Sequence, residues 1–302
     1  MKTRTAWVFP GQGCQEVGIE AELLELPIVK ARLDVSRQIL GWSVLELWSR
    51  PESEMFRTLY TQPCLYVISS IFADLMMQQS QQPFLLAGYS LGEYVALYTA
   101  GVYSFESGLH LVKRRAELMD SAPDGAMVLL LGVEREQLER CLQSTPNVWF
   151  ANDDPNKVII SGTKKAVEAV VAQVQPKRIL QLSIDKPFHS PLMAHSAEEF
   201  RRDLESMHFE LARIPVLSGI EPNSTVEPFV IKQHLLQQIS QPVRWQAVSQ
   251  QLVTQGIERV VEIGSGKFLS NLIKNTCPSL VVESCSFVAQ LNQFSKELVR
   301  AR

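Results

Sequence analysis

A serine held between two glycines is the first candidate for chemistry. Residues 88–92 (GYSLG) fit the pattern G-x-S-x-G, with an apolar run before them and helix-forming residues after them. In this context the glycines allow a tight turn from a strand into a helix, and the serine hydroxyl projects where the first N–H groups of the helix converge. Ser90 is therefore predicted to be a nucleophile, although a serine that only caps a helix fits the same five residues.

A serine nucleophile needs a base, and His189 is the strongest candidate among the five histidines. It lies in the segment DKPFHSPLM, where Pro187 and Pro191 oppose regular structure and fix it in a rigid connection. A histidine that serves only in a turn remains the alternative. The other four lie in polar helical sequence, where we expect them to be solvated: His110, His195, His208 and His234.

Arg115 is a third candidate because helical periodicity turns it inward. In the predicted helix over residues 105–119, the apolar side chains form one face on the side of Arg115, whereas Arg114 points away from it. A buried arginine is costly unless a carboxylate meets it. That carboxylate belongs to an acidic residue of the protein or to a substrate, and periodicity alone favours the protein.

The elements that must position these residues alternate between strands and helices. A buried strand is predicted over residues 5–9, followed by the tight loop PGQG, and helices over roughly 27–40 and 64–79 precede a strand over 83–88 that delivers Ser90. This alternation predicts a parallel sheet covered on both faces. Later elements are helices near 191–207, 228–239 and 243–255, and a strand at RVVEI before a GSG turn.

Residues 125–187 follow a different order. Their pattern reads strand, helix, strand, strand, helix, strand, which is the order of a ferredoxin-like unit. Because this unit is complete in itself, we expect a small subdomain over 125–187 inserted in a large α/β domain of residues 1–124 and 188–302. His189 would then lie where the small subdomain rejoins the large one, in a cleft of the kind that often holds a site.

Composition argues against several other classes of protein. The 302 residues are 46% hydrophobic and 20% charged with a formal net charge of -3, which is typical of a globular protein and offers no basic footprint for nucleic acid. No apolar run is long enough to cross a membrane, and the N-terminal apolar stretch is too short for a signal peptide, so a cytoplasmic location is expected. The five cysteines are scattered without CxxC pairing, so we expect core residues and no metal site.

A series of motifs runs in order along nearly the whole chain. They are FPGQG at 9–13, TQP at 61–63, GYSLGEY at 88–94, VKRRAELM at 112–119, AND at 151–153, FHSPLM at 188–193, QPVRW at 241–245 and EIGSGKFL at 262–269. Together they resemble the malonyl-CoA:acyl carrier protein acyltransferase family, which includes the acyltransferases of polyketide synthases. The resemblance implies an α/β-hydrolase-like large domain with a ferredoxin-like small one. It also implies an acyl-carrier-protein S-malonyltransferase that uses malonyl-CoA as substrate and needs no bound cofactor.

Matched position by position, the resemblance assigns roles to the candidate residues. Ser90 would carry the acyl group, and His189 would serve as general base and later as general acid. A backbone carbonyl around Gln241 would orient the histidine in place of the acid of a catalytic triad. The backbone N–H groups of Gln12 and Leu91 would form the oxyanion hole.

The resemblance also implies a pocket for the acyl group. Arg115 would pair with the free carboxylate of malonyl, and Gln62 and Asn152 match positions that line the same pocket. Leu91 and Phe188 are similar to the bulky residues of malonyl-preferring members, because either would crowd a methyl branch on the acyl group. Such crowding supports a preference of only ~1–3 kcal/mol.

Tyr89 departs from the family, which usually has histidine at this position. A phenol can form a hydrogen bond but cannot share the protonation behaviour of histidine, and some relatives altered here hydrolyse acyl chains from carrier proteins. An acyl hydrolase is therefore the alternative to the transferase. The intact Ser90 and His189 argue against a non-catalytic docking module, and the position of His189 argues against an ordinary esterase, whose histidine normally lies near the C-terminus.

The implied partner is an acidic, phosphopantetheinylated acyl carrier protein of fatty-acid or polyketide synthesis. The segment FHSPLM is more similar to acyltransferases of the polyketide type. Basic residues on or beside the small subdomain either meet this partner or simply face solvent: Lys164, Lys165, Lys177, Arg178 and Lys186.

Overall fold

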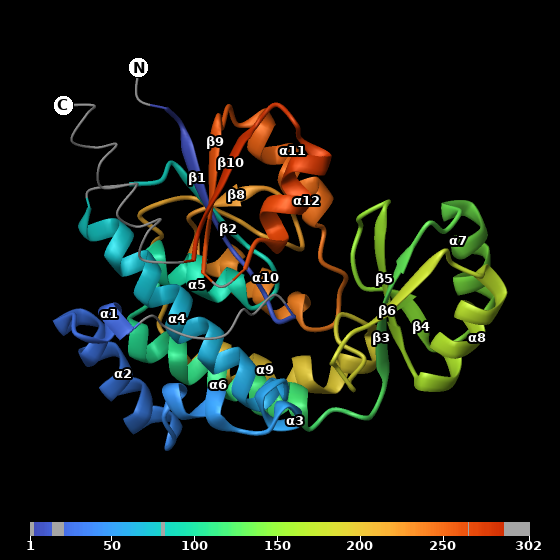
Figure 1. Ribbon diagram of the computed structural model, residues 1–302, viewed down its shortest axis with the longest axis horizontal. Coiled ribbons are helices and arrows are strands. Elements are labelled where there is room, and N and C mark those ends of the chain that lie inside the picture. Colours follow the sequence, from blue (N-terminus) through green and yellow to red (C-terminus); the bar gives the residue numbers. More distant parts are fainter. Residues whose placement is uncertain (1–2, 14–20, 80–81, 265, 287–302) are drawn as a thin grey trace.

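The computed structural model describes residues 3–13, 21–79, 82–264 and 266–286, and it contains two separate sheets (Figure 1). The larger sheet has the strand order β10-β9-β1-β2-β7-β8. Its pairs are parallel except for β7 with β8. The strands are β1 (Thr5–Phe9), β2 (Leu85–Gly88), β7 (Val216–Leu217), β8 (Ser224–Thr225), β9 (Arg259–Ile263) and β10 (Val281–Cys285).

Helices cover both faces of this sheet, as the alternation of elements predicts. Successive side chains of a strand point to opposite faces. On β1, Trp7 and Phe9 pack into the core formed with α2 (Pro27–Leu40), α4 (Thr58–Gln78), α5 (Gly92–Thr99), α6 (Phe105–Asp120), α9 (Ala194–Ser206) and α10 (Pro228–Gln238). Ala6 and Val8 pack on the other side against α11 (Trp245–Thr254) and α12 (Phe268–Thr276).

The smaller sheet is antiparallel and has its own core. Its order is β4-β5-β3-β6, and the chain runs β3 (Ala126–Leu131), α7 (Arg135–Ser144), β4 (Val148–Phe150), β5 (Lys157–Gly162), α8 (Lys164–Val174) and β6 (Arg178–Gln181). The predicted order of strands and helices is thus confirmed. Leu130, Leu138, Ile160 and Val170 lie in a cluster that contains no residue of the larger sheet.

The helix predicted over 64–79 begins earlier, at Thr58. Pro63, which comes directly before the predicted helix, lies inside the observed one, and the helix buries every residue from Thr61 to Ala73. Because a proline in the first turns removes few intrahelical bonds, apolar packing outweighs it there. The consequence is that Gln62 lies on a helix with its side chain directed into the protein.

The prediction that His234 is solvated is wrong. It is only 5% exposed, and its Nε2 lies 3.6 Å from Glu221 Oε2. The helix α10 buries His234 in one stripe with Ile231 and Leu235, a spacing of three and four residues that polar neighbours such as Lys232 and Gln233 obscured. His110, His195 and His208 are exposed as expected.

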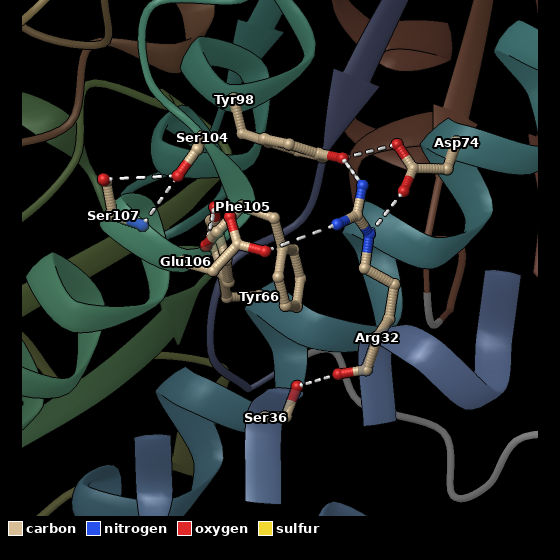
Figure 2. Close-up of polar contacts among 9 residues, drawn as sticks. All are labelled: Arg32, Ser36, Tyr66, Asp74, Tyr98, Ser104, Phe105, Glu106 and Ser107. Atoms are coloured by element: carbon tan, nitrogen blue, oxygen red, sulfur yellow. Dashed lines mark hydrogen bonds and ion pairs between the residues drawn. The ribbon is translucent and has the colours of Figure 1, made fainter. Parts of the chain in front are cut away.

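A polar network anchors the far end of α5, the helix that follows Ser90. Arg32 of α2 donates from Nε to Asp74 Oδ2 at 2.8 Å and from Nη2 to the Tyr98 hydroxyl at 2.7 Å. Tyr98 in turn donates to Asp74 Oδ1 at 2.6 Å, and the Arg32 guanidinium lies 4.6 Å from the ring centroid of Phe105 (Figure 2). These hydrogen bonds connect α2, α4 and α5, which cover one face of the larger sheet, at a point beside α6.

Within the described ranges, no helix has both the length and the apolar character to cross a bilayer. The expected cytoplasmic location stays a prediction. The same ranges hold no cluster of three or more His, Cys, Asp or Glu side chains suited to a metal ion. Cys64, Cys277 and Cys285 are buried and Cys141 is partly buried, all as free thiols, whereas Cys14 lies outside the described residues.

Candidate active site

Ser90 lies in a sharp turn between β2 and α5. Its φ of 52° is in the left-handed region, which a residue other than glycine occupies only under constraint. The turn is so tight that a Cβ on Gly88 would lie 2.0 Å from the Glu93 nitrogen, and one on Gly92 would lie 2.0 Å from the Phe9 carbonyl oxygen. The two glycines of the G-x-S-x-G pattern are therefore required by close backbone approach.

The loop after β1 lies beside this turn because β1 and β2 are parallel neighbours. Phe9 and Gly88 are paired at the strand ends, and the Tyr89 N–H donates to the Phe9 carbonyl at 2.9 Å. Ligands of parallel sheets bind at these carboxyl ends. Gln12 and Leu91 both line the small cavity at Ser90, and among the described residues neither backbone N–H has an acceptor.

His189 reaches Ser90 from a connection on the other side of the cavity. Its Nε2 lies 2.9 Å from Ser90 Oγ, while its Nδ1 lies 2.9 Å from the carbonyl oxygen of Gln238 and 3.2 Å from that of Gln241. Because a carbonyl can only accept, Nδ1 carries the proton and Nε2 is left to accept from the serine hydroxyl.

The closer of these carbonyls, that of Gln238, was missed by sequence reasoning. Gln238 is the last residue of α10, and the final carbonyls of a helix have no intrahelical donor. The predicted end of that helix marks its last carbonyls as groups without an intrahelical donor, but nothing in the sequence places one of them beside His189. Gln241, three residues further on, takes the second contact.

The electrostatic surroundings keep His189 neutral. Burial, followed by the positive charge of Arg115, lowers the pKa of His189 to about 4, against the opposing effect of the Gln238 and Gln241 carbonyls. A neutral imidazole at Nε2 can therefore accept the serine proton near neutral pH.

Arg115 is 1% exposed and faces the cavity, as the helical pattern indicates. Its Nη1 donates to Gln62 Oε1 at 2.5 Å, and its Nη2 donates to Ser90 Oγ at 3.0 Å and to Gln238 Oε1 at 3.1 Å. No carboxylate of the described residues lies within ion-pair distance of it, whereas its neighbour Arg114 pairs with acidic side chains on the surface. Burial lowers the pKa of Arg115. The protein acid that periodicity favoured is thus not found in the part of the chain described.

A chain of hydrogen bonds runs from Arg115 to the loop after β1. Gln62 Nε2 donates to Thr58 Oγ1 at 2.7 Å, and Thr58 donates to Gln12 Oε1 at 2.7 Å. Gln12 Nε2 then donates to the carbonyl of Phe56 at 3.3 Å. The Gln62 side chain, which contacts the arginine, is therefore also connected to Gln12 in the loop after β1, a residue that lines the same cavity as Ser90.

The cavity at Ser90 lies beside a much larger groove. The cavity has a volume of about 50 Å³, and the groove, of about 960 Å³, is lined by α8, β6 and the segment after it together with residues 56–58 of the large part. The two share Gln12, Leu182, Ile184 and Phe188. A long substrate can thus enter between the small and large parts and reach the serine with one end.

Two further candidates are placed differently. Tyr89 is one of the residues that line the cavity, but its ring packs edge-on against Trp245 and Phe268, with centroids 5.6 and 5.9 Å away. Asn152 does not line the cavity: its Nδ2 donates to the Lys157 carbonyl and its Oδ1 accepts from the Ile159 N–H, both at 2.8 Å. Asn152 therefore fixes the backbone of a wall to which Ile159 contributes.

This arrangement suits acyl transfer to and from a serine. The hydroxyl has a base, two N–H groups are available for a developing oxyanion, and a buried cation awaits an anionic group of the substrate.

Comparison with known proteins places the chain among acyltransferases. A family model described as acyl transferase domain matches residues 6–301. A malonyl CoA-acyl carrier protein transacylase of Synechocystis sp. is 43% identical over 290 residues, which are 96% of this chain and 99% of the relative.

Solved structures agree. The crystal structure of the malonyl-CoA:ACP transacylase of Synechocystis sp. superposes with a TM-score of 0.93 at 42% identity, covering 96% of this chain and 100% of the other. A malonyl-transacylase solved in complex with its type II polyketide synthase acyl carrier protein superposes with a TM-score of 0.92 at 30% identity, covering 98% and 100%.

Proposed function

Because this chain belongs to the acyl transferase domain family, we propose that it moves a malonyl group from malonyl-CoA to the phosphopantetheine thiol of an acyl carrier protein. The observation that carries this substrate is the buried guanidinium of Arg115, which contacts Ser90 and has no acidic partner among the described residues. A carboxylate on the acyl group supplies a direct ion-pair partner. The product is a malonyl thioester on the carrier protein.

In the first half of the reaction, Ser90 Oγ attacks the thioester carbonyl of malonyl-CoA. His189 Nε2 takes the hydroxyl proton, and the N–H groups of Gln12 and Leu91 stabilise the oxyanion. When the tetrahedral intermediate collapses, the carbon–sulfur bond breaks and the coenzyme A sulfur leaves with the proton from His189. Ser90 then carries the malonyl ester.

The second half reverses these steps with a different thiol. The phosphopantetheine thiol of the carrier protein gives its proton to His189 and attacks the malonyl ester, and Ser90 Oγ leaves with that proton. The Nδ1–H contacts with the Gln238 and Gln241 carbonyls stabilise the imidazolium at each stage. The cycle uses only these side chains and backbone groups and needs no bound cofactor.

Arg115 selects the acyl group by charge, and Gln62 holds the Arg115 guanidinium in place. A guanidinium can grip a carboxylate with two parallel hydrogen bonds, which fixes both distance and orientation. Phe188 and Leu91 line the cavity beside it and leave little space for a methyl branch. Charge thus selects against plain acyl chains, and shape disfavours branched ones.

The architecture that goes with this function is an α/β-hydrolase-like domain over 1–124 and 188–302 with a ferredoxin-like subdomain over 125–187. The order β4-β5-β3-β6 and the separate cluster of apolar side chains support the subdomain. The strand-turn-helix that carries Ser90 at the end of a parallel strand supports the larger part.

The groove between the two parts is where the carrier protein would deliver its arm. Lys164 and Lys186 line it, and Lys165, Lys177 and Arg178 lie on or beside the same small part. Positive side chains near a groove favour the approach of an acidic protein. The complex of a malonyl-transacylase with its acyl carrier protein supports such a partner.

The experiment that tests this function follows the acyl group by intact-protein mass spectrometry. The protein is mixed with malonyl-CoA, and a phosphopantetheinylated carrier protein is added afterwards. We expect a malonyl adduct that is absent from Ser90→Ala and that moves to the carrier. Release of free malonate faster than transfer would instead establish a hydrolase, the alternative that Tyr89 suggests.

A further inference from the structure

Glu93 is a buried carboxylate that the reaction does not use directly. It lies in the first turn of α5, three residues after Ser90, and is 2% exposed. Its Oε2 accepts from Gln238 Nε2 at 2.7 Å and from the Gly219 N–H at 3.3 Å. Among the described residues it forms no ion pair. Its negative charge is stabilised by these hydrogen bonds and by the nearby charge of Arg115.

Gln238 connects this carboxylate to both functional side chains. Its Nε2 donates to Glu93, its Oε1 accepts from Arg115 Nη2 at 3.1 Å, and its backbone carbonyl accepts from His189 Nδ1 at 2.9 Å. Arg115 and Glu93 therefore face each other across one amide group.

We propose that Glu93 is a positioning residue that fixes the orientation of the Gln238 amide and thereby holds Arg115 ready for the carboxylate of the acyl group. This inference rests on the proposed malonyl transfer. It assigns a role to the glutamate of GYSLGE that acts through two other side chains and never touches the substrate.

The physical reason lies in the different hydrogen-bonding capacities of the groups. An ionised carboxylate can only accept, and a guanidinium can only donate. Between them the amide has one favourable orientation, with its NH₂ toward Glu93 and its oxygen toward Arg115. A neutral amide at position 93 could donate as well as accept, so Gln238 would be free to turn its NH₂ group toward Arg115.

If the Gln238 amide turned, its NH₂ group would face Arg115 Nη2, and two hydrogen-bond donors would oppose each other. The guanidinium would then shift away from the position in which Gln62 and Ser90 also contact it. Recognition of a carboxylate needs that position, whereas attack of Ser90 on an uncharged acyl group does not. Loss of Glu93 should therefore slow acylation by malonyl-CoA more than acylation by acetyl-CoA.

Burial raises the pKa of Glu93 to about 7, and the hydrogen bonds from Gln238 and Gly219 and the charge of Arg115 oppose this rise. The assay is therefore run at about pH 8, where the carboxylate is ionised and acceptor-only.

The test compares Glu93→Gln, Gln238→Met and the double variant with the wild type, by the rate of Ser90 acylation with malonyl-CoA and with acetyl-CoA. We expect Glu93→Gln to lower kcat/KM for malonyl-CoA roughly tenfold, mainly through KM, with little change for acetyl-CoA. Because Glu93 acts through Gln238, the double variant should lose no more than Gln238→Met alone. Glu106→Gln, which removes the first-turn glutamate of the neighbouring α6, is the matched control and should behave as wild type.

Equal losses for malonyl and acetyl substrates, no loss, or multiplying losses in the double variant would each overturn the inference. If Glu93→Gln does not fold, Gln238→Met tests the link from its other end, because it removes the amide that joins Glu93 to Arg115; equal losses for the two substrates, or no loss, would then overturn the inference. A wild type that shows no preference for malonyl would contradict the proposed function itself, which separates the two failures.

Discussion

The guanidinium of Arg115 lies directly against the hydroxyl of Ser90, with Nη2 3.0 Å from Oγ. A carboxylate gripped by this cation necessarily brings the rest of its acyl group to the serine. The same charge also lowers the pKa of His189, together with burial. The same side chain can therefore place an anionic acyl group beside the nucleophile and help to keep the base neutral.

His189 should stay active at unusually low pH. Its pKa falls from 6.5 to about 4 in the folded protein, so the imidazole that accepts the Ser90 proton remains neutral down to about pH 5. We expect the rate of Ser90 sulfonylation by phenylmethanesulfonyl fluoride, which carries no carboxylate, to be level from pH 8 to about pH 5 and to decline only below that.

The imidazole of His189 binds a proton more weakly in the folded protein than in the unfolded chain. Protonation of the unfolded chain therefore lowers the stability of the fold as the pH falls below 6.5. Circular dichroism must accordingly show an intact fold at each pH. The variant Arg115→Ala should move the inflection upward, because the opposing charge is gone. An inflection near 6.5 in the wild type would mean that His189 is not perturbed as the structure indicates.

Phe188 should restrict branched acyl groups. Its side chain is buried in the wall shared by the cavity and the groove. Phe188→Ala should raise the ratio of methylmalonyl to malonyl loading by about 10- to 200-fold, the range for one methyl group in an apolar pocket. Competition between the two coenzyme A thioesters, read by the mass of the Ser90 adduct, measures this ratio, and an unchanged ratio would place the selectivity elsewhere.

Tyr89 should serve packing and leave the fate of the acyl group unchanged. Its edge-on contacts with Trp245 and Phe268 are worth about 0.5–1.5 kcal/mol each beyond area burial. Tyr89→His should lower the free energy of unfolding in urea by about 1–3 kcal/mol and leave the ratio of carrier loading to malonate release as in the wild type. A shift of that ratio would show that the residue before the nucleophile controls access of water.

Local patterns predicted the features that depend on neighbouring residues. The glycines around Ser90 required a strand-turn-helix, and the periodicity of residues 105–119 turned Arg115 inward and Arg114 outward, as found. The order of strands and helices in residues 125–187 was readable for the same reason, since each element shows its own period.

Features that depend on distant contacts were not readable. Gln238 meets His189, Arg115 and Glu93 only because α10 ends beside the serine turn, and no spacing in the chain encodes that meeting. The burial of His234 depends in the same way on what covers α10. The helix α12 and the strand β10 were also missed.

The most direct test of whether Arg115 recognises the acyl carboxylate is to remove its buried positive charge and measure the preference for malonyl. Arg115→Ala is compared with Arg114→Ala, which removes the neighbouring arginine from its surface ion pairs, and the ratio of malonyl to acetyl adducts on Ser90 is read by intact-protein mass spectrometry. The structure predicts that the ratio falls at least about 30-fold in Arg115→Ala, since removing one partner of a buried charge pair costs about 2–5 kcal/mol, and stays as in the wild type in Arg114→Ala. Retention of the malonyl preference in Arg115→Ala would contradict it.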